Sequence, residues 1–185
     1  MGKVLTAIAA MMACVSAKPL VPLPTYPHEA DAVVKVYCQR EAGNVVGSAF
    51  RVTRDTYITA AHVIANGACQ VNGHTIEVTR ADYVKDYATF RGPEGEAILK
   101  ADCEGFKVGG VYLARGYPGS IPMNVQTVWL AVNHIIDDRF VFLGEALPGM
   151  SGGPLIDERG VAVGVVVMRH PTRSTPLNST SFCRG

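Results

Sequence analysis

The sequence has no excess of charge of either sign. Its 185 residues include 17 Lys and Arg against 16 Asp and Glu, a formal net charge of +1. Lys3 is the only charged residue among the first seventeen, so the rest of the chain is neutral overall. Nucleic-acid-binding proteins usually carry a basic domain or stripe. The sequence therefore argues against a nucleic-acid partner.

Repeats and long amphipathic helical stripes are also absent. Without a repeated motif, the 19 Gly and 11 Pro do not fit collagen, and no pattern fits a coiled coil. Apolar residues make up 48% of the chain and charged residues 18%, which excludes wholesale disorder. A chain of this length suffices for one sizeable domain or for two small barrels that share a core.

No apolar run is long enough to anchor the chain permanently in a bilayer, which takes about 20 residues. Residues 1–17 instead place Lys3 before an uncharged apolar run that ends in small residues at Val15-Ser16-Ala17. This layout predicts a signal peptide, and hence a secreted, periplasmic or cell-envelope protein with no stable membrane span after processing. Two alternatives stay open: an apolar segment that remains attached, and lipoprotein anchoring at Cys14.

No Cys-x-x-Cys pair is present, so a zinc site from Cys69, His74 and other thiols is not expected, and neither a metal nor a cofactor is predicted. Removal of residues 1–17 leaves four cysteines, an even number that suits disulfides in an oxidising compartment. Three full connectivities are open, as are buried free thiols. The four are Cys38, Cys69, Cys103 and Cys183.

Residues 18–30 contain four prolines and predict an extended linker. From Asp31 onwards the chain consists of short runs rich in Val, Ile, Thr, Tyr and Phe, separated by turn residues. This spacing predicts an all-β barrel or sandwich, with one short helical turn at 62–66. The runs are VVKVYC, NVVGSAFRVT, TYITAAHVI, HTIEVT, YATFR, GVYLARGYP, NVQTVWLAVN, RFVFLGEA, GPLID and VAVGVVVMR.

The segment Pro148-Gly-Met-Ser151-Gly-Gly-Pro154 surrounds one serine with glycines. Glycines let backbone N–H groups approach a ligand closely, which is the geometry that stabilises a tetrahedral oxyanion. A serine hydroxyl is a poor nucleophile at neutral pH and needs a base. The pattern predicts a nucleophile at Ser151, against the alternative of an ordinary hairpin turn.

His62 is the candidate base, because it ends an apolar run and has small neighbours, Ala60 and Ala61. The other four histidines lie in the linker or at turns and strand ends. A carboxylate should fix the imidazole tautomer, and Asp86 opens an alternating strand after a polar turn. Asp82 precedes that turn and is interpreted as a solvated turn residue.

In this order, TAAHV at His62, Asp-x-Ala at Asp86 and PGxSGGPL at Ser151 resemble the trypsin/chymotrypsin-like serine proteases, especially the compact bacterial and viral members. The resemblance covers about residues 33–170. It implies two packed antiparallel six-stranded β-barrels, at about 31–100 and 101–185, that together form a serine endopeptidase acting on protein or peptide substrates. Gly116-Tyr-Pro-Gly119 resembles a turn that these proteins carry early in the second barrel.

The resemblance further implies roles for individual residues. His62 would act as general base and then acid, Asp86 would orient it, and Ser151 would attack the substrate. The N–H groups of Gly149 and Ser151 would form the oxyanion hole.

Two positions depart from the family pattern. Met150 stands where digestive relatives have an Asp that pairs with a new N-terminus, so no activating cut is expected. Val167 stands where many relatives have a hydroxyl that supports the Asp.

Glu145 falls at the position that lines the base of the primary specificity pocket in this family. A buried carboxylate there would favour Lys or Arg in the substrate. The opposite wall would come from Met168 and Arg169, and Arg169 or His170 could neutralise Glu145. A solvated Glu145 beside an apolar pocket is the alternative.

Two other functions stay open: a peptide-binding module of the same fold with little or no catalysis, and a structural β protein with a chance motif. The sequence predicts no oligomeric state.

Overall fold

The computed structural model describes residues 31–102, 107–119, 124–136, 139–167 and 173–176. Several sequence predictions therefore lie outside the described residues: the leader at 1–17, the linker at 18–30, and the residues Cys14, Cys103, Met168, Arg169, His170 and Cys183. Among the described residues, no helix has the length and apolar character needed to cross a membrane.

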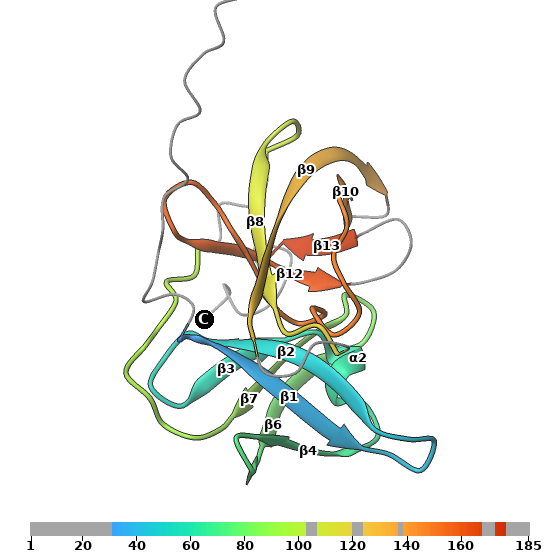
Figure 1. Ribbon diagram of the computed structural model, residues 1–185, viewed down its shortest axis with the longest axis vertical. Coiled ribbons are helices and arrows are strands. Elements are labelled where there is room, and N and C mark those ends of the chain that lie inside the picture. Colours follow the sequence, from blue (N-terminus) through green and yellow to red (C-terminus); the bar gives the residue numbers. More distant parts are fainter. Residues whose placement is uncertain (1–30, 103–106, 120–123, 137–138, 168–172, 177–185) are drawn as a thin grey trace, which may run out of the picture.

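The described chain is all-β and folds into two stacked halves (Figure 1). The first half is a seven-stranded antiparallel sheet in the order β5-β4-β1-β2-β3-β7-β6. Its strands are β1 (Val33–Gln39), β2 (Val45–Arg51), β3 (Thr56–Thr59), β4 (Ala68–Val71), β5 (His74–Thr75), β6 (Glu77–Asp82) and β7 (Tyr87–Arg91), and α2 (Ala61–Ile64) follows β3.

The second half is a closed barrel in the order β10-β13-β12-β11-β8-β9. Its strands are β8 (Val111–Gly116), β9 (Gln126–Ile136), β10 (Arg139–Leu143), β11 (Pro154–Ile156), β12 (Ala162–Val167) and β13 (Arg173–Pro176). The prediction of two packed antiparallel β units is confirmed. The first half differs from six strands because the two-residue strand β5 adds a seventh to the described sheet.

Strand β12 explains why the two halves pack as one body. All six of its residues are buried, which is the pattern of a strand covered on both faces. Val163 and Val166 pack in the core of the barrel, whereas Val165 and Val167 join the core of the first sheet. Apolar burial is the main driving force of folding, so the core of the first sheet, which includes these residues of β12, holds the halves together.

A disulfide joins Cys38 of β1 to Cys69 of β4. The two cysteines are direct cross-strand partners in the sheet, with a Cα–Cα distance of 4.0 Å. The sequence alone left the pairing open. The bond closes a loop that spans 31 residues and contains β2, β3 and α2.

Candidate active site

His62 lies in the short helix α2, which begins two residues after β3 ends. A four-residue helix leaves its last carbonyls without intrahelical partners. Arg40, from the β1–β2 turn, supplies them: its Nη2 donates to the carbonyls of His62 and Val63 at 2.7 and 2.8 Å. Arg40 could not be predicted from the sequence, because its partners are 22 and 23 residues away and no local motif marks the contact.

Asp86 closes the turn between β6 and β7, where it adopts a positive φ of 57°. Asp82 caps this turn by accepting hydrogen bonds from the N–H groups of Val84 and Lys85 at 3.0 and 2.9 Å. This contact is the turn role that the sequence predicted for Asp82. The turn directs Asp86 towards α2.

The Asp86 carboxylate holds His62 at two points. Oδ2 lies 2.7 Å from His62 Nδ1, and Oδ1 accepts the His62 backbone N–H at 2.8 Å. Burial alone would raise the pKa of Asp86. The hydrogen bond and charge of His62, with a smaller contribution from the charge of Arg139, nevertheless hold that pKa below its ordinary value.

An ionised carboxylate accepts hydrogen bonds and cannot donate them. His62 Nδ1 therefore carries the proton in this contact when the imidazole is neutral. The remaining ring nitrogen, Nε2, then keeps a lone pair that can accept a proton.

Ser151 belongs to the loop that precedes β11, and it is 7% exposed. Its carbonyl accepts the N–H of Ser48 at 2.7 Å. The next residue, Gly152, has a φ of +88°, and a Cβ there would collide with Ser48 O and Thr59 Oγ1. The loop thus packs on the end of β3, three residues before His62. Among the described residues, no hydrogen bond joins the Ser151 side chain to His62.

The peptide group before Gly149 has a defined orientation. The carbonyl of Pro148 accepts the N–H of Gly119 at 2.8 Å. The C=O and N–H of a trans peptide point in opposite directions, so the Gly149 N–H is directed away from Gly119. In the described part of the chain, neither this N–H nor that of Ser151 donates a hydrogen bond. Both groups are unengaged donors, two residues apart in the loop that carries Ser151.

No protein-family model matches the sequence, and no curated protein sequence matches it. Solved structures do match. The active form of the Rv3671c protease from M. tuberculosis has a TM-score of 0.74 at 22% identity, over 94% of this chain and 92% of that chain. The serine endoprotease from Yersinia pestis has a TM-score of 0.68 at 18% identity, over 80% of this chain and 59% of that one. The HtrA-type protease AlgW, solved with a tripeptide, has a TM-score of 0.66 at 20% identity, over 83% and 60%.

This chain has the trypsin-like serine protease fold. The matched region spans about three fifths of the Yersinia protein and of AlgW. At identities of 18–22% the likeness concerns the fold, and the roles of individual residues in this chain stay predictions.

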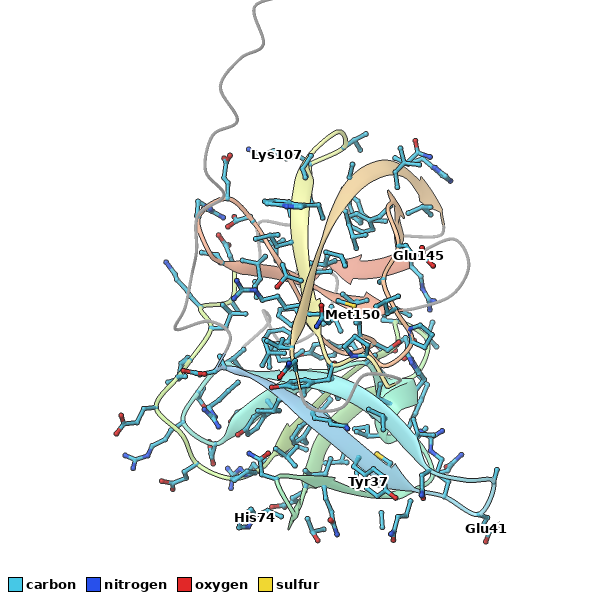
Figure 2. All side chains as sticks on the ribbon, in the orientation of Figure 1. Tyr37, Glu41, His74, Lys107, Glu145 and Met150 are labelled. Carbon is cyan, nitrogen blue, oxygen red and sulfur yellow. A yellow bond between two sulfur atoms is a disulfide. The ribbon has the colours of Figure 1, made fainter. Side chains whose placement is uncertain are left out.

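Met150, the residue before Ser151, is fully buried in the trypsin-like fold (Figure 2). Its side chain packs in the barrel core, and its sulfur accepts the N–H of Leu147 at 3.4 Å. An apolar side chain in this position cannot form an ion pair. The loop must be held in place by other contacts.

Val167 is also buried and offers no hydrogen bond to Asp86. The Asp86 turn instead receives a cation from the second half: Arg139 Nη2 donates to the carbonyl of Val84 at 2.6 Å. Arg139 could not be predicted from the sequence, because 55 residues separate it from Val84.

Glu145 is exposed, which agrees with the alternative of a solvated carboxylate at this position. In Figure 2 it lies at the edge of the second half, apart from the buried Met150. An ionised carboxylate costs much to desolvate without a partner, and the described residues provide none for Glu145. A substrate contact by Glu145 stays a prediction, and the other predicted pocket residues, Met168 and Arg169, lie outside the described residues.

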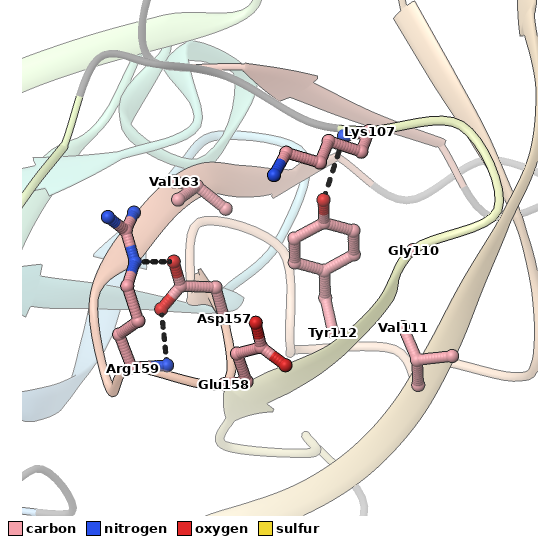
Figure 3. Close-up of a pocket in the computed structure, with 8 residues that line it drawn as sticks. All are labelled: Lys107, Gly110, Val111, Tyr112, Asp157, Glu158, Arg159 and Val163. Atoms are coloured by element: carbon pink, nitrogen blue, oxygen red, sulfur yellow. Dashed lines mark hydrogen bonds and ion pairs between the residues drawn. The ribbon is translucent and has the colours of Figure 1, made fainter.

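A separate pocket lies in the second half, beside β8 and the turn after β11 (Figure 3). Ser151 precedes β11 and the pocket follows it, so the two are at opposite ends of the strand. Arg159 pairs with Asp157 and with Asp102, each at 2.7 Å. One guanidinium is therefore shared by two carboxylates. The lining residues are Lys107, Gly110, Val111, Tyr112, Asp157, Glu158, Arg159 and Val163.

Proposed function

We propose that this protein is a serine endopeptidase that uses Ser151, His62 and Asp86. The observation that carries the proposal is the doubly hydrogen-bonded His62–Asp86 pair, with Ser151 on a loop packed against the same strand end. The unengaged N–H groups of Gly149 and Ser151 add the donors that an oxyanion requires. The trypsin-like fold of the solved proteases supports the same assignment.

In the proposed acylation, Ser151 Oγ attacks the scissile carbonyl carbon while His62 Nε2 takes its proton. The carbonyl oxygen becomes an oxyanion and accepts hydrogen bonds from Gly149 N–H and Ser151 N–H. The imidazolium is stabilised by ionised Asp86. Collapse of the intermediate breaks the C–N bond, and His62 gives its proton to the leaving amine.

Deacylation repeats these steps with water as the nucleophile. His62 removes a proton from water, the resulting hydroxide attacks the acyl ester, and Ser151 leaves with the proton returned by His62. The products are an amine and a carboxylic acid, and the enzyme is regenerated without any cofactor being consumed.

Labelling with a fluorophosphonate probe tests the proposal, because only an activated serine reacts with it readily. We expect one label per chain, located at Ser151 by peptide mass spectrometry. Ser151→Ala and heat-denatured wild-type protein are the controls, and both should remain unlabelled. A folded wild-type protein that takes up no label and cleaves no casein would contradict the proposal.

A catalytically silent peptide-binding module is the second candidate. The observation that favours it is the lack of a described hydrogen bond between Ser151 and His62, together with the low exposure of Ser151. Catalytic hydrogen bonds in ligand-free proteases are often long and tighten with substrate, so we place the enzyme first. If the folded protein takes up no fluorophosphonate label but binds extended peptides saturably, the peptide-binding module would be supported.

We also propose that the protein works outside the cytoplasm after removal of residues 1–17. The Cys38–Cys69 disulfide supports this location, because disulfides persist mainly in oxidising compartments. Intact mass of the protein recovered from an exporting host should correspond to a chain that begins at Lys18. A chain that retains residues 1–17, or that carries lipid on Cys14, would contradict this cleavage site.

A further inference from the structure

We infer that Ser48 is a positioning residue for the oxyanion hole, and that its hydroxyl, with the N–H of Gly119, fixes the two peptide groups that flank Gly149. These two groups, Ser48 Oγ and Gly119 N–H, are called the Gly149 clamp below. The inference rests on the proposed function, and it adds a residue of the first half to the machinery of the second.

Ser48 lies on β2 and is completely buried. Its hydroxyl donates to the carbonyl of Gly149 at 2.8 Å and accepts the N–H of Tyr117 at 2.8 Å. Its backbone N–H donates to the carbonyl of Ser151 at 2.7 Å. Its carbonyl accepts the hydroxyl of Thr59 at 2.7 Å. Each polar group of Ser48 is thus engaged, and three of the four partners belong to the second half.

The contact with Gly149 fixes the peptide group that follows that residue. The contact between Gly119 N–H and Pro148 O fixes the peptide group that precedes it. A Cβ on Gly149 would collide with Gly119 N and Tyr117 O, so the segment 117–119 lies directly against it. The Pro148 carbonyl is therefore held opposite the unengaged Gly149 N–H, and the Gly149 carbonyl is held towards Ser48.

A rotation of the Pro148–Gly149 peptide would break the bond to Gly119 and reverse the direction of the Gly149 N–H. The oxyanion would then face the Pro148 carbonyl instead of a donor. Buried Met150 cannot oppose this rotation by an ion pair. The Gly149 clamp supplies the missing constraint through hydrogen bonds that form with the fold itself.

The clamp should act on the transition state, because the oxyanion develops there and in the tetrahedral intermediate but is absent from the bound substrate. Loss of one oxyanion-hole donor typically lowers kcat by about 10²–10³-fold. Ser48→Ala should therefore lower kcat for casein, and the rate of fluorophosphonate labelling, by about 10²-fold, with KM changed by less than about threefold. A purely structural role would lower the amount of folded protein without this separation of kcat from KM.

Tyr117→Phe is the matched control for Ser48→Ala. It removes another hydrogen bond between the halves, from Tyr117 Oη to the carbonyl of Val33 at 3.2 Å, and keeps the Tyr117 N–H that meets Ser48. We expect kcat within about threefold of wild type. Equal losses of kcat in Ser48→Ala and Tyr117→Phe would overturn the inference, as would a folded Ser48→Ala protein with wild-type kcat.

Gly119→Pro tests the second group of the clamp, the Gly119 N–H. It also keeps the inference testable if Ser48→Ala does not fold. Proline removes the N–H that meets Pro148 O and places its ring Cδ against that oxygen, so it opposes the clamp directly. The added Cβ itself has no atom closer than 3.8 Å. Gly119→Ala keeps the N–H and measures what the added side chain alone costs. We expect a selective loss of kcat in Gly119→Pro relative to Gly119→Ala, and equal kcat values would overturn the inference.

Hydrogen–deuterium exchange separates failure of this inference from failure of the proposed function. The hydrogen-bonded amides of Leu147, Met150 and Gly119 should exchange at least tenfold faster in Ser48→Ala than in wild type or Tyr117→Phe. An unlabelled, inactive wild-type protein would refute the protease. Unchanged exchange in Ser48→Ala would refute the clamp whether or not the wild type is active.

Discussion

His62 illustrates how few atoms define the chemistry of the site. Its Nδ1 and its backbone N–H both contact one carboxylate, and its carbonyl contacts Arg40. The ring therefore has little freedom to turn, and only Nε2 remains for a proton. Asp86 sets both the orientation and the tautomer of the His62 ring. The charge of its carboxylate and the shape of its side chain therefore make separate contributions.

Asp86→Asn separates these two effects, because the amide keeps the shape and loses the charge. The amide can donate to Nδ1, which would place the ring proton on Nε2 and block its action as a base. We expect kcat to fall by about 10⁴-fold, and by about 10⁴–10⁶-fold in His62→Ala. Casein hydrolysis by matched amounts of folded protein measures this. Near wild-type kcat in either variant would reject its assigned role.

Asp86 should also make stability depend on pH. Its folded pKa lies below the ordinary value of 3.8, so its stabilising contribution is complete above that value and is lost as pH falls through the folded pKa. Wild type should therefore exceed Asp86→Asn in free energy of unfolding near pH 6, and the gap should shrink below about pH 4. Urea unfolding from about pH 6 to pH 3 measures the gap, and a constant gap would contradict this.

Residues of the site differ in how visible they are in the sequence. His62, Asp86 and Ser151 could be proposed because each sits in a short local pattern whose chemistry is recognisable. Ser48, Arg40 and Arg139 have no such pattern, and Ser48 meets Gly149 across 101 residues. Glu145 is the opposite case: its spacing from Ser151 suggested a pocket position, but spacing does not determine burial, and the residue is exposed.

Among the elements, the loop before β11 depends most on close backbone approach. Gly152 donates to the carbonyl of Val166 and has no space for a side chain against Ser48 and Thr59. This approach delivers Ser151 to the end of β3. It requires both a positive φ and the absence of a Cβ.

Gly152→Ala and Gly73→Ala separate these two requirements. The φ values are similar, +88° and +78°, but a Cβ on Gly73 has no atom within 4 Å. Gly73→Ala should lose about 1–2 kcal/mol of unfolding free energy from the positive φ alone. Gly152→Ala should lose about 1–3 kcal/mol more from the collision, and most of its activity. Equal losses in urea unfolding would show that the loop is not tightly packed.

Ten strand-like runs were visible in the sequence, because each is rich in β-branched and aromatic residues and turn residues separate most of them. Two strands were not visible. β4 has only four residues between two turns, and β13 has the polar sequence RSTP. β13 forms because β12 and β10 both pair with it, which is a property of the assembled barrel and not of its own residues.

At the scale of the whole molecule, the proposed catalytic groups are held by contacts that lie within residues 31–167. Ser48 and Thr59 brace the nucleophile loop from the first half, and the shared core joins the halves. Met150 is buried and apolar, so it cannot form an ion pair with a freed N-terminus. Activity should not depend on where the chain begins.

Proteins that begin at Met1, Lys18 and Asp31 test whether activity is independent of the N-terminus. We expect kcat/KM for casein to agree within about threefold among them, because the oxyanion-hole loop makes its contacts with residues 48 and 117–119. Fluorophosphonate labelling gives the active fraction of each preparation. A strict requirement for one N-terminus would mean that the loop needs a contact from residues 1–30.

Among the described residues, the sheet of the first half is open, unlike the closed barrel, and its two edge strands determine how readily it pairs with a strand of another molecule. One edge is β5, which has only two residues. The other is β6, which places exposed Glu77 and Arg80 along its length and shifts register between Val78 and Arg80. Short, charged and irregular edges are poor templates for a strand from another molecule. The open half should therefore resist β-sheet aggregation at concentrations at which a flat apolar edge would assemble into fibrils.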